Sequence, residues 1–393
     1  MMKILSVNSG SSSLKFKMYE MPEEKEIISG VFERIGENNS FYTIKLNGEK
    51  IEKKVELDNH EDAVKYLIEE LIENKVIKSL EEIKGVGHRV VHGADKYASS
   101  VIITNDVIRD LEKFSDLAPL HNPANILGIK AFKKMIPNAV EVAVFDTAFH
   151  QTMKEENYLY AVPYEWYTNY GVRKYGFHGI SHHYLTKRMM EILRKKDAKI
   201  ITCHLGNGGS ITAVCGGKCV DTSMGFTPNA GIIMGTRTGD IDGSIIPYMV
   251  EKTGKSLSEI INILNKNSGL LGISGVSNDS RDIEDGIANG NKRCALAQKM
   301  FVQSIVDYIA RYYVKLNGVD AICFAGGIGE KSIKTRKEII EKLAVLGIKL
   351  DEQANNVRGK EALITTSDSG IPCYVIPTNE ELMIARDAFS FVK

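Results

Sequence analysis

The feature that most constrains the fold of this chain is a strand, a glycine-containing turn and a returning strand, a pattern that occurs twice. Residues 4–19 (ILSVNSGSSSLKFKMY) read as an apolar strand, a turn of small residues and an alternating strand, and residues 199–220 repeat this around LGNGGS. Glycine reaches backbone angles closed to other residues, and serine and asparagine add donors that converge on one point. Such a turn suits a phosphate group.

A third glycine-rich turn, AGGIGEKS at residues 325–332, follows an apolar strand and opens a predicted helix. Three turns of this type favour a nucleotide-binding protein. The sequence has no GxxxxGK[ST] motif, which disfavours a P-loop nucleotidase. A Rossmann dehydrogenase is also disfavoured, because its glycine fingerprint joins a strand to a helix, whereas the first turn here leads into another strand.

The order of the predicted elements indicates a duplicated α/β fold. The first hairpin continues as a meander with a type I′ turn at Asn47 and Gly48, and helices and strands then alternate, with Asn122 as the cap of one helix. After a segment rich in aromatic residues, a second meander begins at residue 199. We expect a first domain at residues 1–150, completed by a C-terminal helix at 382–393, a second domain at 151–381, and a ligand cleft between them.

Composition excludes several partners. The 393 residues carry 50 basic and 50 acidic side chains, so the net charge of zero argues against a nucleic-acid or anionic-membrane surface. No apolar run is long enough for a membrane span, and Met1 leads directly into a strand, so we expect no signal peptide and a cytoplasmic location. The six cysteines lack paired metal-ligand spacing and are expected to be buried free thiols.

Charged and polar residues concentrate in turns and at strand ends, where functional side chains are common. Taken singly, each is as readily explained by a loop ion pair or a helix cap, and only their joint placement favours a site. The histidines of HGISHH have poor zinc-ligand spacing, so carboxylate-held magnesium is favoured over zinc. The candidates are Arg89, Asp146, His178, His204, Arg237, Asp240, Asp242, Arg281, Glu380 and Glu381.

Ten motifs spread over nearly the whole chain carry a resemblance to a known family: NSGSSSLK, GHRVVHG, PLHNPAN, FDTAFH, YGFHG, HLGNG, DTSMGFTP, MGTRTGDID, GGIGE and PTNEELMIARD. In this order they resemble the acetate kinases, members of the acetate and sugar kinase, Hsp70 and actin superfamily. The resemblance implies duplicated actin-like (ribonuclease H-like) domains, each a mixed sheet flanked by helices, with the nucleotide cleft between them. It also implies a homodimer that reversibly transfers the γ-phosphoryl group of ATP to acetate, giving acetyl phosphate and ADP by direct in-line transfer.

The resemblance assigns roles to individual residues. Asn8 and Glu380 would bind Mg²⁺, with Mn²⁺ as an alternative, and Asp146, His178, Arg237 and Arg89 would be catalytic, with Arg89 also holding the acetate carboxylate. The apolar substrate pocket would comprise Val91, Leu120, Phe177 and Pro228. The ATP or ADP site would comprise Lys15, Ser11, Ser13, His204, Leu205, Gly206, Asn207, Gly208, Asp279, Ser280, Arg281, Gly327, Ile328, Gly329, Glu330 and Lys331.

The chemistry agrees with this assignment. A carboxylic acid with a pKa of about 4 is ionised at neutral pH, so the attacking oxygen needs no general base, and we interpret Asp146 as an orienting group. Two alternatives stay open: a propionate or butyrate kinase, and a non-kinase ATPase switch of the same superfamily. The second would not require the anion site that Arg89 and Arg237 provide beyond the γ-phosphate.

Overall fold

The computed structural model describes residues 1–392, and its contacts divide the chain into two units. Unit 1 comprises Met1–Phe149 and the segment from Asn379 onward, and unit 2 comprises His150–Thr378. The first boundary lies one residue before the position expected from the sequence. Residues 379–381, which the sequence places in the second domain, group with unit 1 because the last helix packs on its sheet.

Unit 1 is built on an eight-stranded mixed sheet in the order β5-β4-β3-β2-β1-β6-β8-β7. The first five strands form the predicted antiparallel meander, and Asn47 and Gly48 both have positive φ, as a type I′ turn requires. β6 then pairs in parallel with β1, and β8 with β6. The strands are β1 (Met2–Ser9), β2 (Ser13–Met21), β3 (Lys25–Glu33), β4 (Phe41–Leu46), β5 (Glu49–Lys54), β6 (Ile83–Val90), β7 (Val101–Ile102) and β8 (Val140–Phe145).

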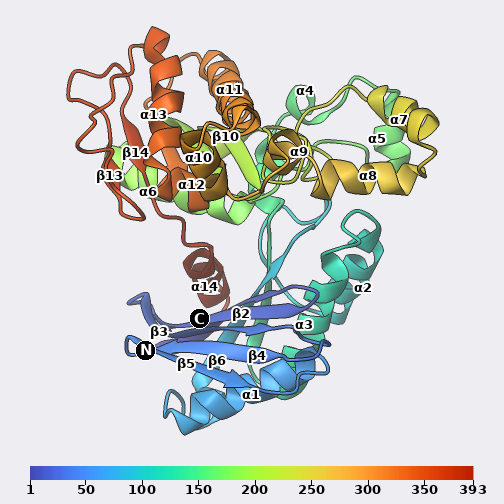
Figure 1. Cartoon of the computed structure of the whole chain (residues 1–393). Coiled ribbons are helices and arrows are strands. Elements are labelled where there is room, and N and C mark those ends of the chain that lie inside the picture. The colour runs from blue at the N-terminus through green and yellow to red at the C-terminus, as the bar shows by residue number, and fades with distance from the viewer. Residues whose placement is uncertain (393) are drawn as a thin grey trace. The chain divides into compact units, whose positions relative to one another are not determined.

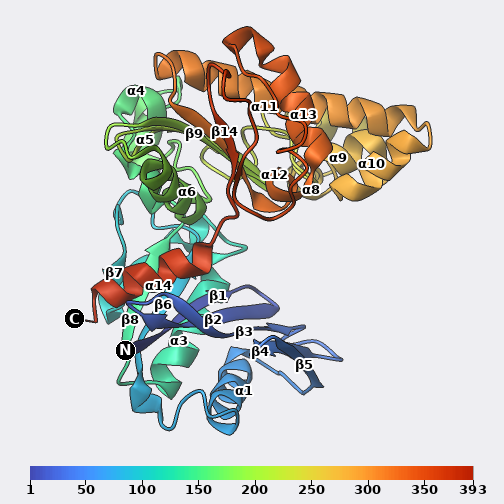
Figure 2. The same cartoon turned by 90° about the vertical axis from the view of Figure 1, so that its left-hand side faces the viewer.

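Helices cover both faces of this sheet. α3 packs on β1 and β6 with α1 beside it, and α14, from the far end of the chain, packs on β1 and β6 from the other side (Figures 1 and 2). The approach is close, because a Cβ on Gly87 would lie 2.6 Å from the Ile384 side chain. The helices are α1 (His60–Glu73), α2 (Asn105–Lys113), α3 (Asn122–Met135) and α14 (Glu380–Ser390), with 3₁₀ turns η1 (Leu80–Glu82), η2 (Phe114–Asp116) and η3 (Ala148–Thr152).

The predicted helix cap at Asn122 is wrong. The cap position is His121, and Asn122 is the first residue of α3. Its side chain is fully buried and bonds to the backbone N–H of His92 over 3.1 Å and to the carbonyl of His92 over 3.0 Å. Asn122 thus fastens the loop after β6 rather than the start of its own helix.

Unit 2 repeats the strand order of unit 1. Its six-stranded sheet runs β11-β10-β9-β12-β14-β13. β9, β10 and β11 are antiparallel, and β12 and β14 follow in parallel, as β1, β2 and β3 are followed by β6 and β8. This confirms the predicted duplication. The strands are β9 (Lys199–Leu205), β10 (Gly209–Cys215), β11 (Lys218–Thr222), β12 (Ala321–Ala325), β13 (Ala362–Leu363) and β14 (Cys373–Val375).

Two helices cover the sheet of unit 2 from opposite sides, α6 on β9 and β12 and α11 on β9 and β10 (Figure 2). A capping box between Ser256 and Glu259 is present at the start of α8. The helices are α4 (Glu155–Tyr158), α5 (Tyr164–Tyr170), α6 (Gly179–Leu193), α7 (Ile245–Thr253), α8 (Leu257–Lys266), α9 (Gly269–Ser274), α10 (Ser280–Ala288), α11 (Lys292–Lys315), α12 (Gly326–Lys331) and α13 (Ile333–Lys342), with the 3₁₀ turn η4 (Ala344–Leu346).

All six cysteines are free, and all but the partly exposed Cys215 are buried, as the sequence predicts. Within residues 1–392, no helix combines the length and apolar character needed to cross a bilayer.

Candidate functional site

In unit 1, three predicted site residues meet at the ends of neighbouring strands. Arg89 is the next-to-last residue of β6, and Asp146 directly follows β8, its parallel neighbour. Nε and Nη2 of Arg89 both donate to the Asp146 carboxylate, and Nε lies 3.2 Å from Oδ1 of Asp146. Nη1 of Arg89 donates to Oδ1 of Asn8 over 3.3 Å. Asp146 is buried and Arg89 is partly exposed. Asp146 therefore holds the partly exposed Arg89 guanidinium in place at this edge of the sheet.

Glu380, the first residue of α14, belongs to the same cluster. Burial raises the pKa of Glu380 to about 7, while Arg89 and Lys15 lower it and the carboxylates of Asp146 and Glu381 raise it. Negative charge here is thus only partly balanced by the neighbouring cations. The cluster is one that an added positive charge would stabilise.

The donors of this cluster fit a magnesium ion. Asn8 supplies an amide oxygen and Glu380 a carboxylate, and Mg²⁺ in nucleotide sites typically takes one or two carboxylates together with phosphate oxygens and water. Among residues 1–392 there is no group of three or more His, Cys, Asp or Glu side chains arranged to hold a metal.

The first glycine turn carries the other predicted groups of unit 1. Gly10 closes the turn by donating to the carbonyl of Ser13 over 2.7 Å, and Ser11 is exposed while Ser13 is partly exposed. Lys15 lies opposite Asn8 in the β1–β2 register, with its side chain exposed while Leu14 and Phe16 are buried. Lys15 also lines a pocket of about 230 Å³ with Lys17 and Lys45.

In unit 2, His178 stands at the start of α6 in an unusual backbone conformation. Its φ of 57° and ψ of 23° are left-handed, a region that few non-glycine residues occupy and that is enriched at functional sites. Its Nδ1 is 2.9 Å from Oγ of Ser210, and its ring stacks on His204 with centroids 4.4 Å apart. Both contacts fix the direction of the ring.

Arg237 approaches His178 from a long loop between β11 and α7. The loop is held by a bond from the Met234 N–H to the Arg237 carbonyl over 3.1 Å, and Nη1 of Arg237 donates to the Pro228 carbonyl over 3.3 Å. Within the described residues no carboxylate lies within 4.0 Å of its guanidinium. Burial lowers the pKa of Arg237 from its usual value, yet an arginine stays charged at neutral pH. A half-buried guanidinium without a carboxylate is suited to bind an anion.

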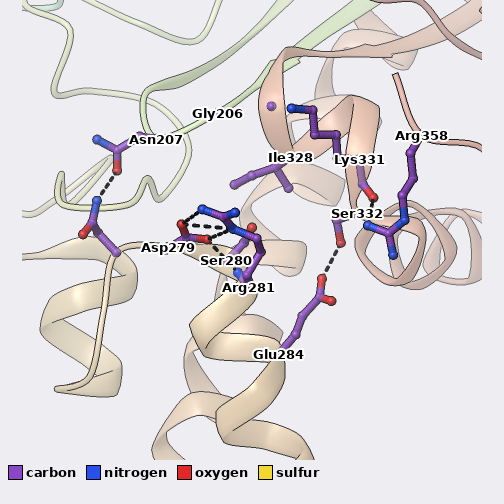
Figure 3. A pocket seen from close by; sticks show the side chains of 12 residues that line it. Gly206, Asn207, Asp279, Ser280, Arg281, Glu284, Ile328, Lys331, Ser332 and Arg358 are labelled. Carbon is purple, nitrogen blue, oxygen red and sulfur yellow. Dashed lines mark hydrogen bonds and ion pairs between the residues drawn. The ribbon is translucent and has the colours of Figure 1, made fainter. Parts of the chain in front are cut away.

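A pocket of about 340 Å³ opens in unit 2 where the β9–β10 turn, the start of α10 and the GGIG helix α12 meet (Figure 3). Asp279 caps α10 and pairs with Arg281 there, and this ion pair lowers the pKa of Asp279 to about 2. Eight predicted nucleotide-site residues line the pocket: Gly206, Asn207, Asp279, Ser280, Arg281, Gly327, Ile328 and Lys331.

Of the unit 2 residues predicted for the nucleotide site, five do not line this pocket, namely His204, Leu205, Gly208, Gly329 and Glu330, and the predicted Ser11, Ser13 and Lys15 belong to unit 1. Glu330 has a structural contact instead, because its Oε1 accepts from the backbone N–H groups of Gly326 over 2.9 Å and Thr378 over 3.2 Å. It thereby ties the glycine turn to the segment before α14. Leu205 and Gly329 are buried.

Four lining residues were missed by the sequence analysis: Asn278, Glu284, Ser332 and Arg358. Asn278 precedes a predicted residue and bonds to Oδ1 of Asn207 over 2.9 Å, so extending that segment by one would have found it. Arg358 lies in an irregular loop without a motif and donates to the Lys331 carbonyl over 2.8 Å. The sequence carries no signal for its position.

The four residues predicted to form an apolar substrate pocket differ in exposure. Val91 and Phe177 are buried, Pro228 is partly exposed and Leu120 is 70% exposed. Val91 and Leu120 belong to unit 1, and Phe177 and Pro228 to unit 2. The shared pocket stays a prediction.

Comparisons with known proteins agree on one family. Residues 3–386 match the sequence profile of the Acetokinase family. The chain is 54% identical over 389 residues to the acetate kinase of Geobacillus sp. (strain WCH70), covering 98% of each chain, and 53% identical over 395 residues to that of Bacillus subtilis (strain 168), covering 100% of each.

Solved structures show the same fold. A Porphyromonas gingivalis acetate kinase superposes with a TM-score of 0.95 at 44% identity, covering 100% of both chains. A Francisella tularensis propionate kinase superposes with a TM-score of 0.94, also at 44% identity, covering 99% of this chain and 100% of that one.

Proposed function

Because the chain belongs to the Acetokinase family, we propose that it catalyses the reversible transfer of the γ-phosphoryl group of ATP to acetate, which gives acetyl phosphate and ADP. One structural observation supports this beyond family membership. The Arg237 guanidinium lies beside His178 and has no carboxylate within 4.0 Å among the described residues. A guanidinium that is not paired with a carboxylate of the protein can stabilise the charge on a transferred phosphoryl group. An arginine in this role raises the rate roughly 10³- to 10⁵-fold.

The proposed roles follow the positions of the groups in each unit. The 340 Å³ pocket of unit 2 holds ATP, with Asn207 and Lys331 on its wall. Arg89 of unit 1 holds the acetate carboxylate, and Asp146 holds Arg89 in position. The acetate oxygen attacks the γ-phosphorus in line, Arg237 neutralises charge on the equatorial oxygens, His178 donates a hydrogen bond to them, and no group needs to remove a proton.

We further propose Mg²⁺ as the metal, with Mn²⁺ as an alternative, held by Asn8 and Glu380. A bound divalent cation neutralises phosphate charge and orients the phosphoryl group. In this arrangement Asp146 orients Arg89 and water rather than acting as a base.

A homodimer is the assembly that the surface of unit 2 supports. α7 has the sequence IIPYMVEKT, and none of its nine residues is buried, although most are apolar. α7 packs on α8, and together they expose Ile245, Tyr248, Leu257 and Ile261. Exposed apolar side chains gathered on two helices that pack together favour an interface. A second copy of this chain is the proposed partner, and the proposed location is the cytoplasm, where free thiols persist.

The dimer proposal is tested by replacing Tyr248→Asp and Ile245→Glu together. Light scattering after gel filtration should give twice the 43.6 kDa chain mass for the unaltered protein and a smaller mass for the variant. A monomeric unaltered protein would contradict the dimer.

A propionate kinase is the second candidate, because a propionate kinase and an acetate kinase match this chain with equal identity. The fold therefore does not choose between the two acids. Trapping acyl phosphate with hydroxylamine, in reactions of ATP and Mg²⁺ with acetate, propionate or butyrate, makes the choice. We expect acetate to give the highest kcat/KM. ADP release without any acid-dependent hydroxamate would instead support an ATPase switch.

A further inference from the structure

Ser210, on β10, lies between His178, which directly precedes α6, and His182 on α6. Its Oγ is 2.9 Å from Nδ1 of His178 and 2.7 Å from Nε2 of His182. Nδ1 of His182 lies in turn 2.7 Å from Oγ1 of Thr202 on β9. Ser210, His182 and Thr202 are fully buried. A continuous series of hydrogen bonds thus runs from the interior of unit 2 to the partly exposed His178.

The distances favour one direction for the protons. A hydroxyl has one proton, so Ser210 donates to one histidine and accepts from the other. If Ser210 donates to His178, Nε2 of His182 carries a proton and Nδ1 of His182 accepts the hydroxyl proton of Thr202 over 2.7 Å. In the reverse direction Thr202 would donate to the Thr212 carbonyl over 3.5 Å, which is long for a hydrogen bond. The first direction satisfies every group at normal length.

The proposed direction of hydrogen bonding requires His182 to be neutral, with a proton on Nε2 and an acceptor at Nδ1. A neutral imidazole has one donor and one acceptor nitrogen. Burial lowers the pKa of His182 well below its usual value, and the neighbouring His150 and His204 lower it further. His182 is therefore neutral and donates from one nitrogen only.

We propose that Ser210 is a positioning residue that holds neutral His178 in the tautomer with its proton on Nε2. The inference rests on the proposed function, in which Nε2 of His178 faces the transferred phosphoryl group. Nε2 lies on the side of Gly208, where Nη1 of Arg237 also lies, because a Cβ on Gly208 would be 3.6 Å from the first and 3.3 Å from the second. With its Nδ1 accepting from Ser210, His178 presents an N–H donor to a phosphoryl oxygen without having to be charged.

The tautomer can be measured in the protein without substrates. In protein labelled with ¹⁵N at its nine histidines, long-range nitrogen–proton correlations identify the protonated nitrogen of each ring, and His178→Asn and His182→Asn assign two of them. We expect the Nε2–H tautomer for both. A proton on Nδ1 of His178 in the unaltered protein overturns the proposal. This result is independent of which reaction the protein catalyses.

Kinetics of Ser210→Ala give the second readout. Without the Ser210 hydroxyl, His178 should populate both tautomers, and kcat should fall about 10- to 100-fold, as is typical when an outer partner of a functional histidine is lost. KM for ATP and for acetate should stay within about twofold, since Ser210 is fully buried. Unchanged kcat together with an unchanged His178 tautomer overturns the proposal.

Thr202→Val keeps the side-chain shape and removes the hydroxyl at the far end of the series. In the proposed direction it removes a donor, so the proton of His182 should stay on Nε2, where Ser210 accepts it, and kcat should fall less than in Ser210→Ala. The comparison decides the direction if the Ser210 variant does not fold. A His182 proton that lies on Nδ1 in the unaltered protein and moves to Nε2 in Thr202→Val contradicts the proposed direction. The control is Thr186→Val, on α6, because the buried Thr186 hydroxyl has no hydrogen-bond partner among residues 1–392. A protein that forms no acetyl phosphate would defeat the proposed function and leave the tautomer result standing.

Discussion

Nη1 of Arg237 and Nε2 of His178 converge on the Cα of Gly208, so that a methyl group placed there would lie 3.3 Å from the first nitrogen and 3.6 Å from the second. A side chain at this position is therefore tight against Arg237 and in ordinary contact with His178. Gly208→Ala should displace the guanidinium by a few tenths of an ångström and lower kcat, though by less than the roughly 100-fold that a displacement of about 1 Å causes. Steady-state kinetics check this against Gly243→Ala, since a Cβ on Gly243 meets nothing within 4 Å. Equal kcat in the two variants would contradict the placement of the phosphoryl group.

Arg237→Ala should lower turnover by about 10³- to 10⁵-fold, which raises the barrier by about 4 to 7 kcal/mol. The fold should persist, because the guanidinium pairs with no carboxylate among the described residues and bonds only to a backbone carbonyl and a thioether. Circular dichroism together with the acyl phosphate assay tests both statements. The matched control is Arg109→Ala, whose side chain is exposed on α2. Near-normal turnover in a folded Arg237→Ala variant would remove this residue from the site.

Arg89→Met should lower both turnover and stability, in contrast to Arg237→Ala. It leaves the Asp146 carboxylate buried without its guanidinium, and breaking a buried pair in this way costs about 3 to 5 kcal/mol. The double variant Arg89→Met/Asp146→Asn removes both charges and should regain much of the free energy of unfolding without regaining turnover. Denaturant titration of the three proteins measures this. If the double variant is no more stable than the single one, the pair does not have the assigned electrostatic role.

Val91→Ala should improve propionate relative to acetate while leaving KM for ATP unchanged, because Val91 is buried directly after Arg89 and Val90 and is expected to contact the acid's methyl group. One methylene in such a pocket is worth about 1 to 3 kcal/mol, so the unaltered protein should use propionate roughly 10- to 200-fold less efficiently than acetate. The ratio of kcat/KM for the two acids is the measurement. An unchanged ratio in the variant would show that Val91 does not line the pocket.

Stability should fall on mild acidification because of His150. Burial lowers the pKa of His150 to about 4 in the folded state, with smaller opposing contributions from the Phe177 carbonyl and Asp221. The unfolded state binds the proton near pH 6.5, so this stability is complete above that pH and is lost as the pH falls toward 4. Between pH 7.5 and pH 5 the loss should be roughly 2 kcal/mol. Denaturant titrations at the two pH values should show a smaller loss in His150→Gln, and an equal loss would exclude this histidine as its source.

The sequence could predict the parts of this protein that depend on local patterns. The alternation of Leu14, Lys15 and Phe16 predicted the right faces of β2. The sequence also placed Arg89 and Asp146 at strand ends, and the structure adds that they meet because β6 and β8 are parallel neighbours.

Contacts made by irregular segments could not be predicted in this way. Arg358 lines the 340 Å³ pocket from a loop, Asn122 bonds to a distant backbone rather than capping its helix, and Glu330 bonds to two separate segments. The series through Ser210 joins α6, β9 and β10, and the motif HGISHH indicates only the start of a helix. In each case the partner is fixed by tertiary packing and not by spacing along the chain.

The proposed function requires that the γ-phosphoryl group of ATP is transferred to acetate and not to water. Phosphorus NMR of a reaction containing the protein, Mg²⁺, ATP and acetate tests this most directly, because it counts acetyl phosphate and inorganic phosphate against ADP. We expect one acetyl phosphate for each ADP, with no ADP formed when acetate is left out. ADP accompanied by inorganic phosphate, at a rate that acetate does not change, would contradict it.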